Sequence, residues 1–91
     1  MAASLRDPRY RAVVARLVEL RKEAGLNQRD VAERLGRTQS YVAKVELCER
    51  RLDIIQLIEL LRALGADEGE FLVETAAAIP MAKRRRPGSK G

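Results

Sequence analysis

The chain has 91 residues, of which 46% are hydrophobic and 34% are charged, which fits one small helical domain and excludes a disordered chain. One cysteine and no histidine leave no internal disulfide and no basis for a zinc site. No apolar run approaches the roughly 18 residues of a membrane span, and the first ten residues lack the apolar stretch of a signal peptide. We therefore expect a cytoplasmic protein, close to the nucleoid if it binds DNA, with no membrane segment, metal or cofactor.

The formal net charge of +5 is concentrated at the end of the chain. Residues 1–79 contain 13 basic and 13 acidic side chains, whereas residues 80–91 contain five basic side chains and no acidic one. Within the first 79 residues the charges also separate, because residues 52–79 hold one basic side chain against six acidic ones. A basic first half together with a basic tail favours a polyanionic partner.

Residue patterns predict five α-helices and no β-strand. Each helix begins after a short polar residue suited to capping, and in chain order these residues are Asp7, Asn27, Thr38, Asp53 and Asp67. Glu70 is also spaced to complete a capping box with Asp67. Three helices are followed by a glycine, which can end a helix in the left-handed conformation, and these are Gly25, Gly36 and Gly65. We expect an all-α bundle over residues 1–79 and a flexible basic tail over residues 80–91.

The second and third helices, at about residues 28–35 and 39–47, are joined by only three residues. Such a turn sets two helices at a steep angle. The third helix leaves polar side chains outside, which suit hydrogen bonding in a DNA major groove: Gln39, Ser40, Tyr41 and Lys44. Gln28, at the tip of the second helix beside free backbone N–H groups, suits a phosphate. One tip would then hold the DNA backbone while the other reads bases.

The fourth helix, Ile54 to Leu64, is apolar nearly all round. Because so small a domain cannot bury every side of this helix, we expect a homodimer through the fourth and fifth helices. The expected interface residues are Ile54, Leu57, Leu61, Phe71 and Leu72. In the alternative, the fifth helix and the tail cover this surface within one chain.

The segments LRKEAGLNQRDVAERLGRTQSYVAKVE and LLRALGAD resemble the phage-repressor type of helix-turn-helix, the Cro/CI or XRE family. The resemblance covers roughly residues 12–73 and combines several short motifs at matching spacing. It implies a lambda-repressor-like bundle of five helices whose third helix recognises DNA. The implied function is a sequence-specific, double-stranded-DNA-binding transcription regulator that reads a palindrome as a homodimer.

The resemblance also implies roles for individual residues. Those facing bases are Gln39, Ser40, Tyr41 and Lys44, although Tyr41 has packing on the turn as an equally open alternative. By the same resemblance, Gln28 meets a phosphate. We also expect Arg29, Arg37, Arg50 and Arg51 to contact the DNA backbone, because together they surround the proposed groove face, although each taken alone could be ordinary surface charge. Arg21 and Glu46 match an ion pair that joins the first helix to the third, and Gln28 is also placed to brace Gln39.

One position departs from the family pattern. Cys48 stands where the family often has a glycine soon after the third helix. Since cysteine adopts the left-handed conformation less readily, we expect the third helix to extend or the following loop to be reshaped. Either change would affect the placement of Arg50 and Arg51.

Two other functions remain open from the residues alone. An antitoxin-like module would have a small protein as its main partner, and a nonspecific nucleic-acid-binding protein would act through its tail. The basic arm of that tail consists of Lys83, Arg84, Arg85 and Arg86, and its contacts with phosphates would add affinity without sequence preference. An enzyme is not expected, because the chain lacks histidine, a glycine-rich phosphate loop and an acid–base pair.

Overall fold

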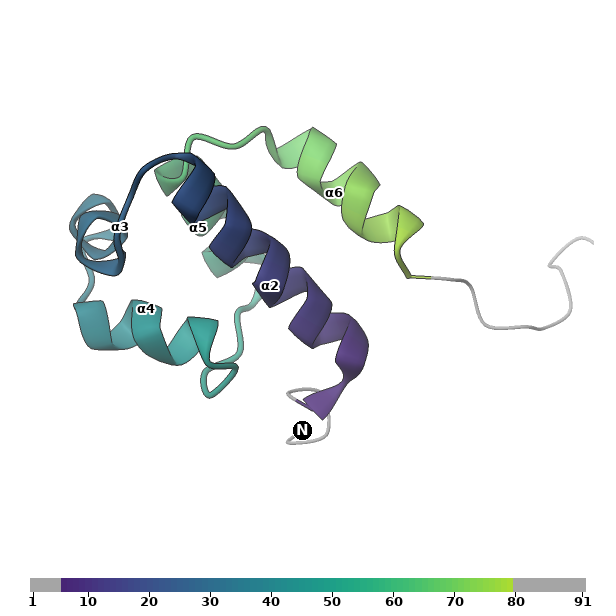
Figure 1. The fold of residues 1–91 in the computed structure, drawn as a ribbon, viewed down its shortest axis with the longest axis horizontal. Helices are drawn as coiled ribbons and strands as arrows, with labels where there is room; N and C mark the ends of the chain where they lie inside the picture. Colours follow the sequence, from purple (N-terminus) through teal and green to yellow (C-terminus); the bar gives the residue numbers. More distant parts are fainter. Residues whose placement is uncertain (1–5, 80–91) are drawn as a thin grey trace, which may run out of the picture.

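A computed structural model describes residues 6–79, which form five helices and no strand. The helices are α2 (Pro8–Glu23), α3 (Gln28–Leu35), α4 (Gln39–Glu46), α5 (Ile54–Ala63) and α6 (Glu68–Ala77). Helices α2 to α5 form the body of the domain, and α6 extends away from α3 and α4 (Figure 1). No helix within residues 6–79 is both long and apolar enough to cross a membrane.

The five expected N-caps all form. The side chains of Asp7, Asn27, Thr38, Asp53 and Asp67 each accept a hydrogen bond from a backbone N–H two or three residues further on. In α3 and α5 a second bond completes a capping box, because the side chains of Asp30 and Gln56 accept from the cap residue's N–H. In α6 Asp67 accepts from the Glu70 N–H, but the return bond of the expected capping box is not made.

Arg9 holds the Asp7 cap of α2 in its charged form. The Asp7 carboxylate accepts the backbone N–H of Arg9 at 2.8 Å and its guanidinium at 2.7 Å. The side-chain hydrogen bond and then the backbone one lower the pKa of Asp7 from its ordinary value of 3.8 to about 2. Because the folded-state pKa lies below the ordinary one, this stabilisation is complete above pH 3.8 and is lost as the pH falls toward 2.

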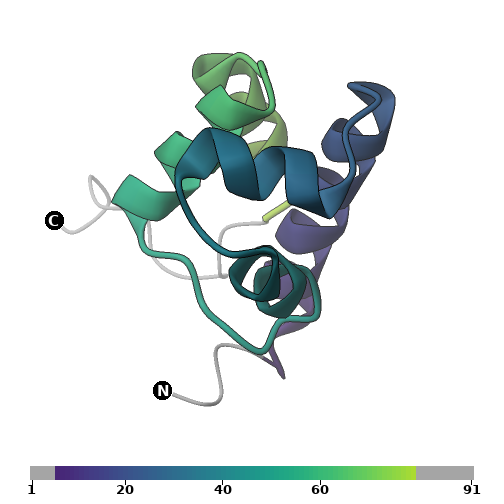
Figure 2. The same ribbon diagram turned by 90° about the vertical axis from the view of Figure 1, so that its left-hand side faces the viewer.

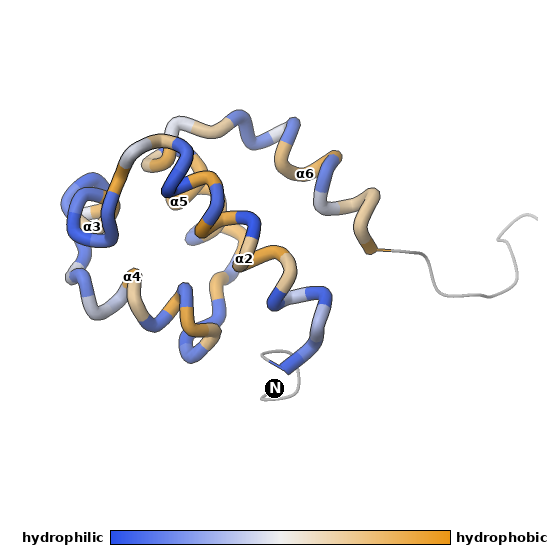
Figure 3. Tube along the Cα trace, viewed as in Figure 1, coloured by the Kyte–Doolittle hydropathy of each residue, from blue (hydrophilic) through white to orange (hydrophobic). Residues whose placement is uncertain are grey.

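An aliphatic core with one aromatic residue holds the five helices together. Its members are Leu17, Val31, Ala32, Val42, Val45, Leu60, Leu61, Ala63, Leu64 and Phe71. Helix α5 packs against α3 on one side and α6 on another, and its sequence is mostly hydrophobic while that of α3 is mostly hydrophilic (Figure 3). Since α3 and α4 have only eight residues each, they depend on this packing, because isolated helices of that length are marginal in water.

Two of the residues expected at a dimer interface belong to this core instead. Leu61 is 2% exposed and Phe71 is 3% exposed, so neither can contact a second chain, and this part of the prediction is wrong. The reason is that α3 and α6 pack against α5 on its inner side. These contacts bury both side chains within one chain. Leu57 packs partly against the core, whereas Ile54 and Leu72 are exposed by 61% and 57%.

Cys48 takes the left-handed conformation that glycine takes after α2, α3 and α5. Its φ is 61°, and no other non-glycine residue in the described range 6–79 has a positive φ. The Cys48 N–H donates to the carbonyl of Val45 at 3.0 Å, and the Glu49 N–H donates to that of Lys44 at 2.8 Å. Gly36 ends α3 with the same pair of bonds. Helix α4 is therefore not extended, and the turn keeps its form with a buried thiol at the strained position.

This conformation predicts that glycine is more stabilising than alanine at position 48, the reverse of their usual order within a helix. Cys48→Gly and Cys48→Ala both remove the buried thiol, but only glycine relieves the left-handed strain. We expect the glycine variant to be more stable than the alanine variant by about 1 kcal/mol. Chemical denaturation measures the difference, and Ala15→Gly, at an exposed site within α2, is the control that should lower stability by about 1 kcal/mol. An alanine variant as stable as the glycine variant would show that position 48 is not strained.

Candidate nucleic-acid interface

Helices α3 and α4 cross at a steep angle at one end of the domain. Helix α3 is seen nearly end-on in Figure 1, where α4 runs across the view, and the two exchange orientations in Figure 2. Val42 and Val45 of α4 are buried against the core. Gln39, Ser40 and Lys44 of the same helix are exposed. The outward face of α4 is therefore polar and free of the packing that holds the helix in place.

A chain of polar contacts joins the ends of three helices behind this face. Arg21 of α2 pairs with Glu46, with Nε 2.6 Å from Oε2 and Nη2 3.0 Å from Oε1. Glu46 Oε1 also accepts a hydrogen bond from Gln28 Nε2 at 2.8 Å. Gln28 Oε1 in turn accepts one from Gln39 Nε2 at 3.4 Å. The last residue of α4 is thus connected to the first residue of α3, and through it to the first residue of α4.

The Glu46 carboxylate determines the orientation of both glutamine amides in this series of contacts. A carboxylate only accepts hydrogen bonds, so Gln28 must turn its NH₂ group toward Glu46 and its oxygen toward Gln39. Gln39 must then turn its NH₂ group toward Gln28, which leaves its oxygen and its second N–H for another partner. The resemblance to the family suggested the Arg21–Glu46 pair and the Gln28–Gln39 contact separately. The bond that joins Gln28 to Glu46 was missed, because nothing local links residues 18 positions apart.

The arginines of the domain divide into paired and unpaired groups. Four arginines pair with carboxylates, and they are Arg9, Arg16, Arg21 and Arg62. Five cations on or beside α3 and α4 have no carboxylate of residues 6–79 within ion-pair distance, and they are Arg29, Arg34, Arg37, Lys44 and Arg50. Of these, Arg34 donates instead to the backbone carbonyl of Ala63. The formal neutrality of the domain therefore hides a surface with local positive charge.

The remaining predicted residues surround the same surface. Gln28 is half-buried at the tip of α3, and Arg29 is exposed next to it. An open hollow between the tips of α3 and α4 is lined by Arg21, Asn27, Gln28, Arg29 and Gln39. Arg37, Arg50 and Arg51 are exposed in the turn before α4 and the loop after it. Tyr41 differs from its expected exposed position, because it is half-buried and packs against the core. The expected basic arm, Lys83 to Arg86, lies outside the described residues and stays a prediction.

A side chain from α2 fixes the loop that follows α4. The hydroxyl of Tyr10 accepts a hydrogen bond from the backbone N–H of Leu52 at 3.1 Å. With the left-handed turn at Cys48, this contact gives the loop two points of attachment. The backbone that carries Arg50 and Arg51 is therefore held beside α4, although both side chains are exposed.

Comparison with known proteins establishes the family. A family model described as helix-turn-helix matches residues 17–71, which is more than half of the chain. The chain belongs to the Cro/CI-type, XRE helix-turn-helix family. It is accordingly a DNA-binding transcriptional regulator, and the family is not enzymatic.

Solved structures support the same assignment. An XRE-family like protein from Pseudomonas syringae pv. tomato has a TM-score of 0.79 and 40% identity, covering 86% of this chain and 95% of its own. The clp gene regulator ClgR from C. glutamicum has a TM-score of 0.67 and 25% identity, covering 80% and 95% of the two chains. The restriction-modification controller protein C.Esp1396I, in a point-mutant form, has a TM-score of 0.72 at 19% identity, over 85% and 98%, and supports the fold alone. The expected five-helix, lambda-repressor-like fold is confirmed.

A relative among curated proteins is consistent with these structures. The HTH-type transcriptional regulator y4dJ of Sinorhizobium fredii is 36% identical over 63 residues, covering 69% of this chain and 82% of its own length. The similarity thus extends over more than two thirds of each of the two sequences.

The Arg21–Glu46 pair predicts a large loss of stability when it is broken. The two side chains are only 12% and 14% exposed, so Arg21→Gln leaves the Glu46 carboxylate with little solvent and without the two hydrogen bonds that the guanidinium donates. We expect this variant to lose about 2 kcal/mol in the free energy of unfolding, measured by chemical denaturation. The matched control is Arg62→Gln, which breaks an ion pair whose arginine is 73% exposed and should cost about 0.5 kcal/mol or less. Equal losses in the two variants would contradict a structural role for the Arg21–Glu46 pair.

Proposed function

We propose that this XRE-family protein regulates transcription by recognising a specific DNA sequence, with α4 in the major groove. Gln39, Ser40 and Lys44 face the base edges. The observation that carries the proposal is the contact chain from Glu46 through Gln28 to Gln39, because it leaves the Gln39 amide with one acceptor and one donor facing outward. Glutamine reads adenine through such a donor–acceptor pair.

The surrounding cations would hold the phosphate backbone. Arg29, Arg37 and Arg50 have no carboxylate partner among residues 6–79, so a phosphate would neutralise them without breaking an existing ion pair. Arg51 and the tip of α3, with Gln28 and free backbone N–H groups, complete the same role. These contacts set the position of α4 but carry no sequence information.

We further propose that the protein binds a palindromic operator as a homodimer. Three apolar side chains next to the loop after α4 are exposed by more than half: Leu47, Ile54 and Ile55. A second copy packed at this loop would bring two α4 helices onto one side of the dimer, as two half-sites one DNA turn apart require. The positions of these side chains beside the loop favour Ile54 over Leu72 as the centre of the interface.

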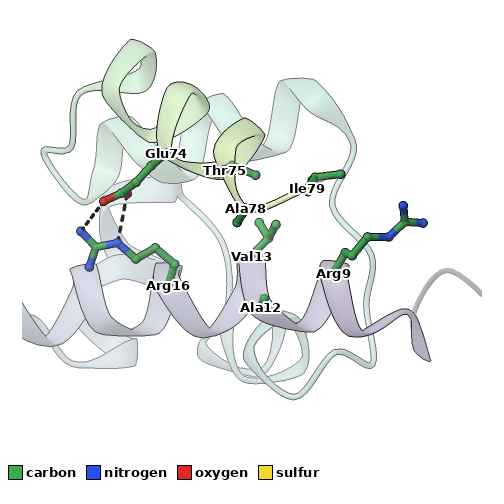
Figure 4. A pocket seen from close by; sticks show the side chains of 8 residues that line it. All are labelled: Arg9, Ala12, Val13, Arg16, Glu74, Thr75, Ala78 and Ile79. Carbon is green, nitrogen blue, oxygen red and sulfur yellow. Dashed lines mark hydrogen bonds and ion pairs between the residues drawn. The ribbon is translucent and has the colours of Figure 1, made fainter. Parts of the chain in front are cut away.

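A groove between α2 and α6 is the competing apolar surface. It has a volume of about 250 Å³ and an apolar lining that includes Val13, Ala78 and Ile79. Arg9 lies at one end of the groove and the Arg16–Glu74 ion pair at the other (Figure 4). The groove is lined by residues of α2 and α6. Because α6 extends away from α3 and α4 (Figure 1), a dimer formed there would not directly set the spacing of the recognition helices.

The base-reading role of Gln39 can be tested by truncation. Gln39→Ala should weaken binding to the cognate site, selected from random DNA, by about 1–3 kcal/mol and leave binding to random DNA nearly intact. Titrations at one fixed salt concentration measure both affinities. The control is Arg29→Gln, which removes a phosphate contact and should weaken both kinds of binding alike. If Gln39→Ala lost affinity equally on the two DNAs, Gln39 would not read a base.

The dimer can be tested with two matched substitutions. Ile54→Glu and Leu72→Glu each place a carboxylate at a site exposed by 61% and 57% in the single chain, so both variants should fold. We expect Ile54→Glu to sediment as a monomer at high micromolar concentration, while the wild type and Leu72→Glu sediment as dimers. A dimer dissociated by Leu72→Glu alone would move the interface to α6. A monomeric wild type would contradict the dimer altogether.

The same apolar surface supports a second candidate function, an antitoxin-like module. Leu47, Ile54 and Ile55 would then pack against a small protein of a different sequence. Co-purification of such a protein with a wild type that is monomeric alone, and its loss in Ile54→Glu, would favour this function over the homodimer.

A further inference from the structure

Two arginines from different loops meet at one aromatic ring. The guanidinium carbon of Arg37 lies 4.5 Å from the centre of the Tyr41 ring, and that of Arg50 lies 5.0 Å from it. Tyr41 belongs to the first turn of α4 and packs against the core. The ring is therefore fixed by the body of the domain, while the two cations that it attracts remain exposed.

The backbone conformation before each arginine places its side chain beside the ring. Arg37 directly follows the left-handed Gly36, and its N–H donates to the carbonyl of Ala32 at 2.9 Å. Arg50 comes two residues after the left-handed Cys48, and its N–H donates to the carbonyl of Lys44 at 3.2 Å. The two helix-ending turns thus bend the chain toward the same side of α4. Without the turn at Cys48, a longer α4 would carry Arg50 onward along the helix axis.

The two positive charges near the Tyr41 ring are not fully neutralised by the described residues. Two like charges near one ring repel each other, and cation–π attraction offsets only part of that cost at an exposed site. Neither Arg37 nor Arg50 has a carboxylate of residues 6–79 within ion-pair distance. A bound anion would satisfy both guanidinium groups at once, and guanidinium donors match phosphate oxygens well.

We propose that Tyr41 is a positioning residue, whose ring holds Arg37 and Arg50 together as a clip for the DNA phosphate backbone beside α4. This inference rests on the proposed function, and it gives Tyr41 a role other than base contact. The ring acts through the arginines, because it holds them in place before DNA arrives and so lowers the entropy lost on binding. The clip adds affinity for any duplex and does not choose a sequence.

The test replaces the ring and follows binding to cognate and random DNA. Tyr41→Leu keeps an apolar side chain against the core and removes the ring, so it should weaken binding to both DNAs about threefold to tenfold, the size of one or two exposed cation–π contacts. Tyr41→Phe keeps the ring and should restore the affinity that Tyr41→Leu loses. A loss confined to cognate DNA, or an equal loss in Tyr41→Phe, would overturn the clip in favour of a direct contact by Tyr41.

A double-mutant comparison separates positioning from a general structural effect. In a chain that carries Arg37→Gln and Arg50→Gln, Tyr41→Leu should cause no further loss of affinity, because the groups that it positions are gone. In a chain that carries Arg29→Gln, which has no contact with the ring, the loss should be as large as in the wild type. A loss of the same size in both backgrounds would overturn the proposal.

One measurement needs neither DNA nor the leucine variant. In the free full-length protein, the ring current of Tyr41 should shift the NMR signals of the Arg37 and Arg50 side chains, and Tyr41→Phe should retain the shifts. Absence of these shifts in the wild type would overturn the clip even if Tyr41→Leu failed to fold. A wild type with no preference for any selected sequence would count against the proposed function instead, whatever the variants show.

Discussion

The helix-turn-helix depends on one carboxylate, that of Glu46 at the end of α4. A negative charge is unfavourable at a helix C-terminus, and here it is also largely removed from solvent. Arg21 and Gln28 offset this cost with three hydrogen bonds to the two oxygens. These bonds join α2, α3 and α4 at the point where α4 meets the core. The same charge sets the orientation of Gln28 and hence of Gln39, so one interaction serves both the fold and the surface that we assign to DNA.

Helix ends matter unusually in this domain because its central helices are so short. N-terminal caps and left-handed turns satisfy backbone groups that two-turn helices would otherwise leave exposed. The turns also direct the residues that follow them. Gly36 and Cys48 bend the chain so that Arg37 and Arg50 reach Tyr41, which makes the strained Cys48 part of the surface geometry as well as of the fold.

The local charge of the surface depends on which side chains form ion pairs as much as on the amino-acid composition. Residues 1–79 are formally neutral, yet several acidic side chains are engaged by arginines remote from the outer face of α4. Within residues 6–79, Arg29, Arg37 and Lys44 have no carboxylate partner on the face that we assign to DNA. Apolar residues divide in a similar way, since α5 buries Leu60 and Leu61 while Ile54 at its start stays exposed.

The sequence alone determined the features that depend on neighbouring residues. Caps such as Asn27 and Thr38, and the helices behind them, could be predicted because the groups involved lie within four positions of one another. The Arg21–Glu46 pair was expected only through resemblance to the family, since its partners are 25 positions apart.

Only the tertiary structure decided which apolar side chains are buried within one chain. Hydrophobic character alone did not distinguish Leu61 and Phe71 from the exposed Ile54 and Leu72, because burial depends on which helices cover a side chain. The convergence of Arg37 and Arg50 on Tyr41 likewise arises from two turns far apart in the chain. Local hydrogen bonding sets helix ends, but packing among distant segments decides which side chains meet.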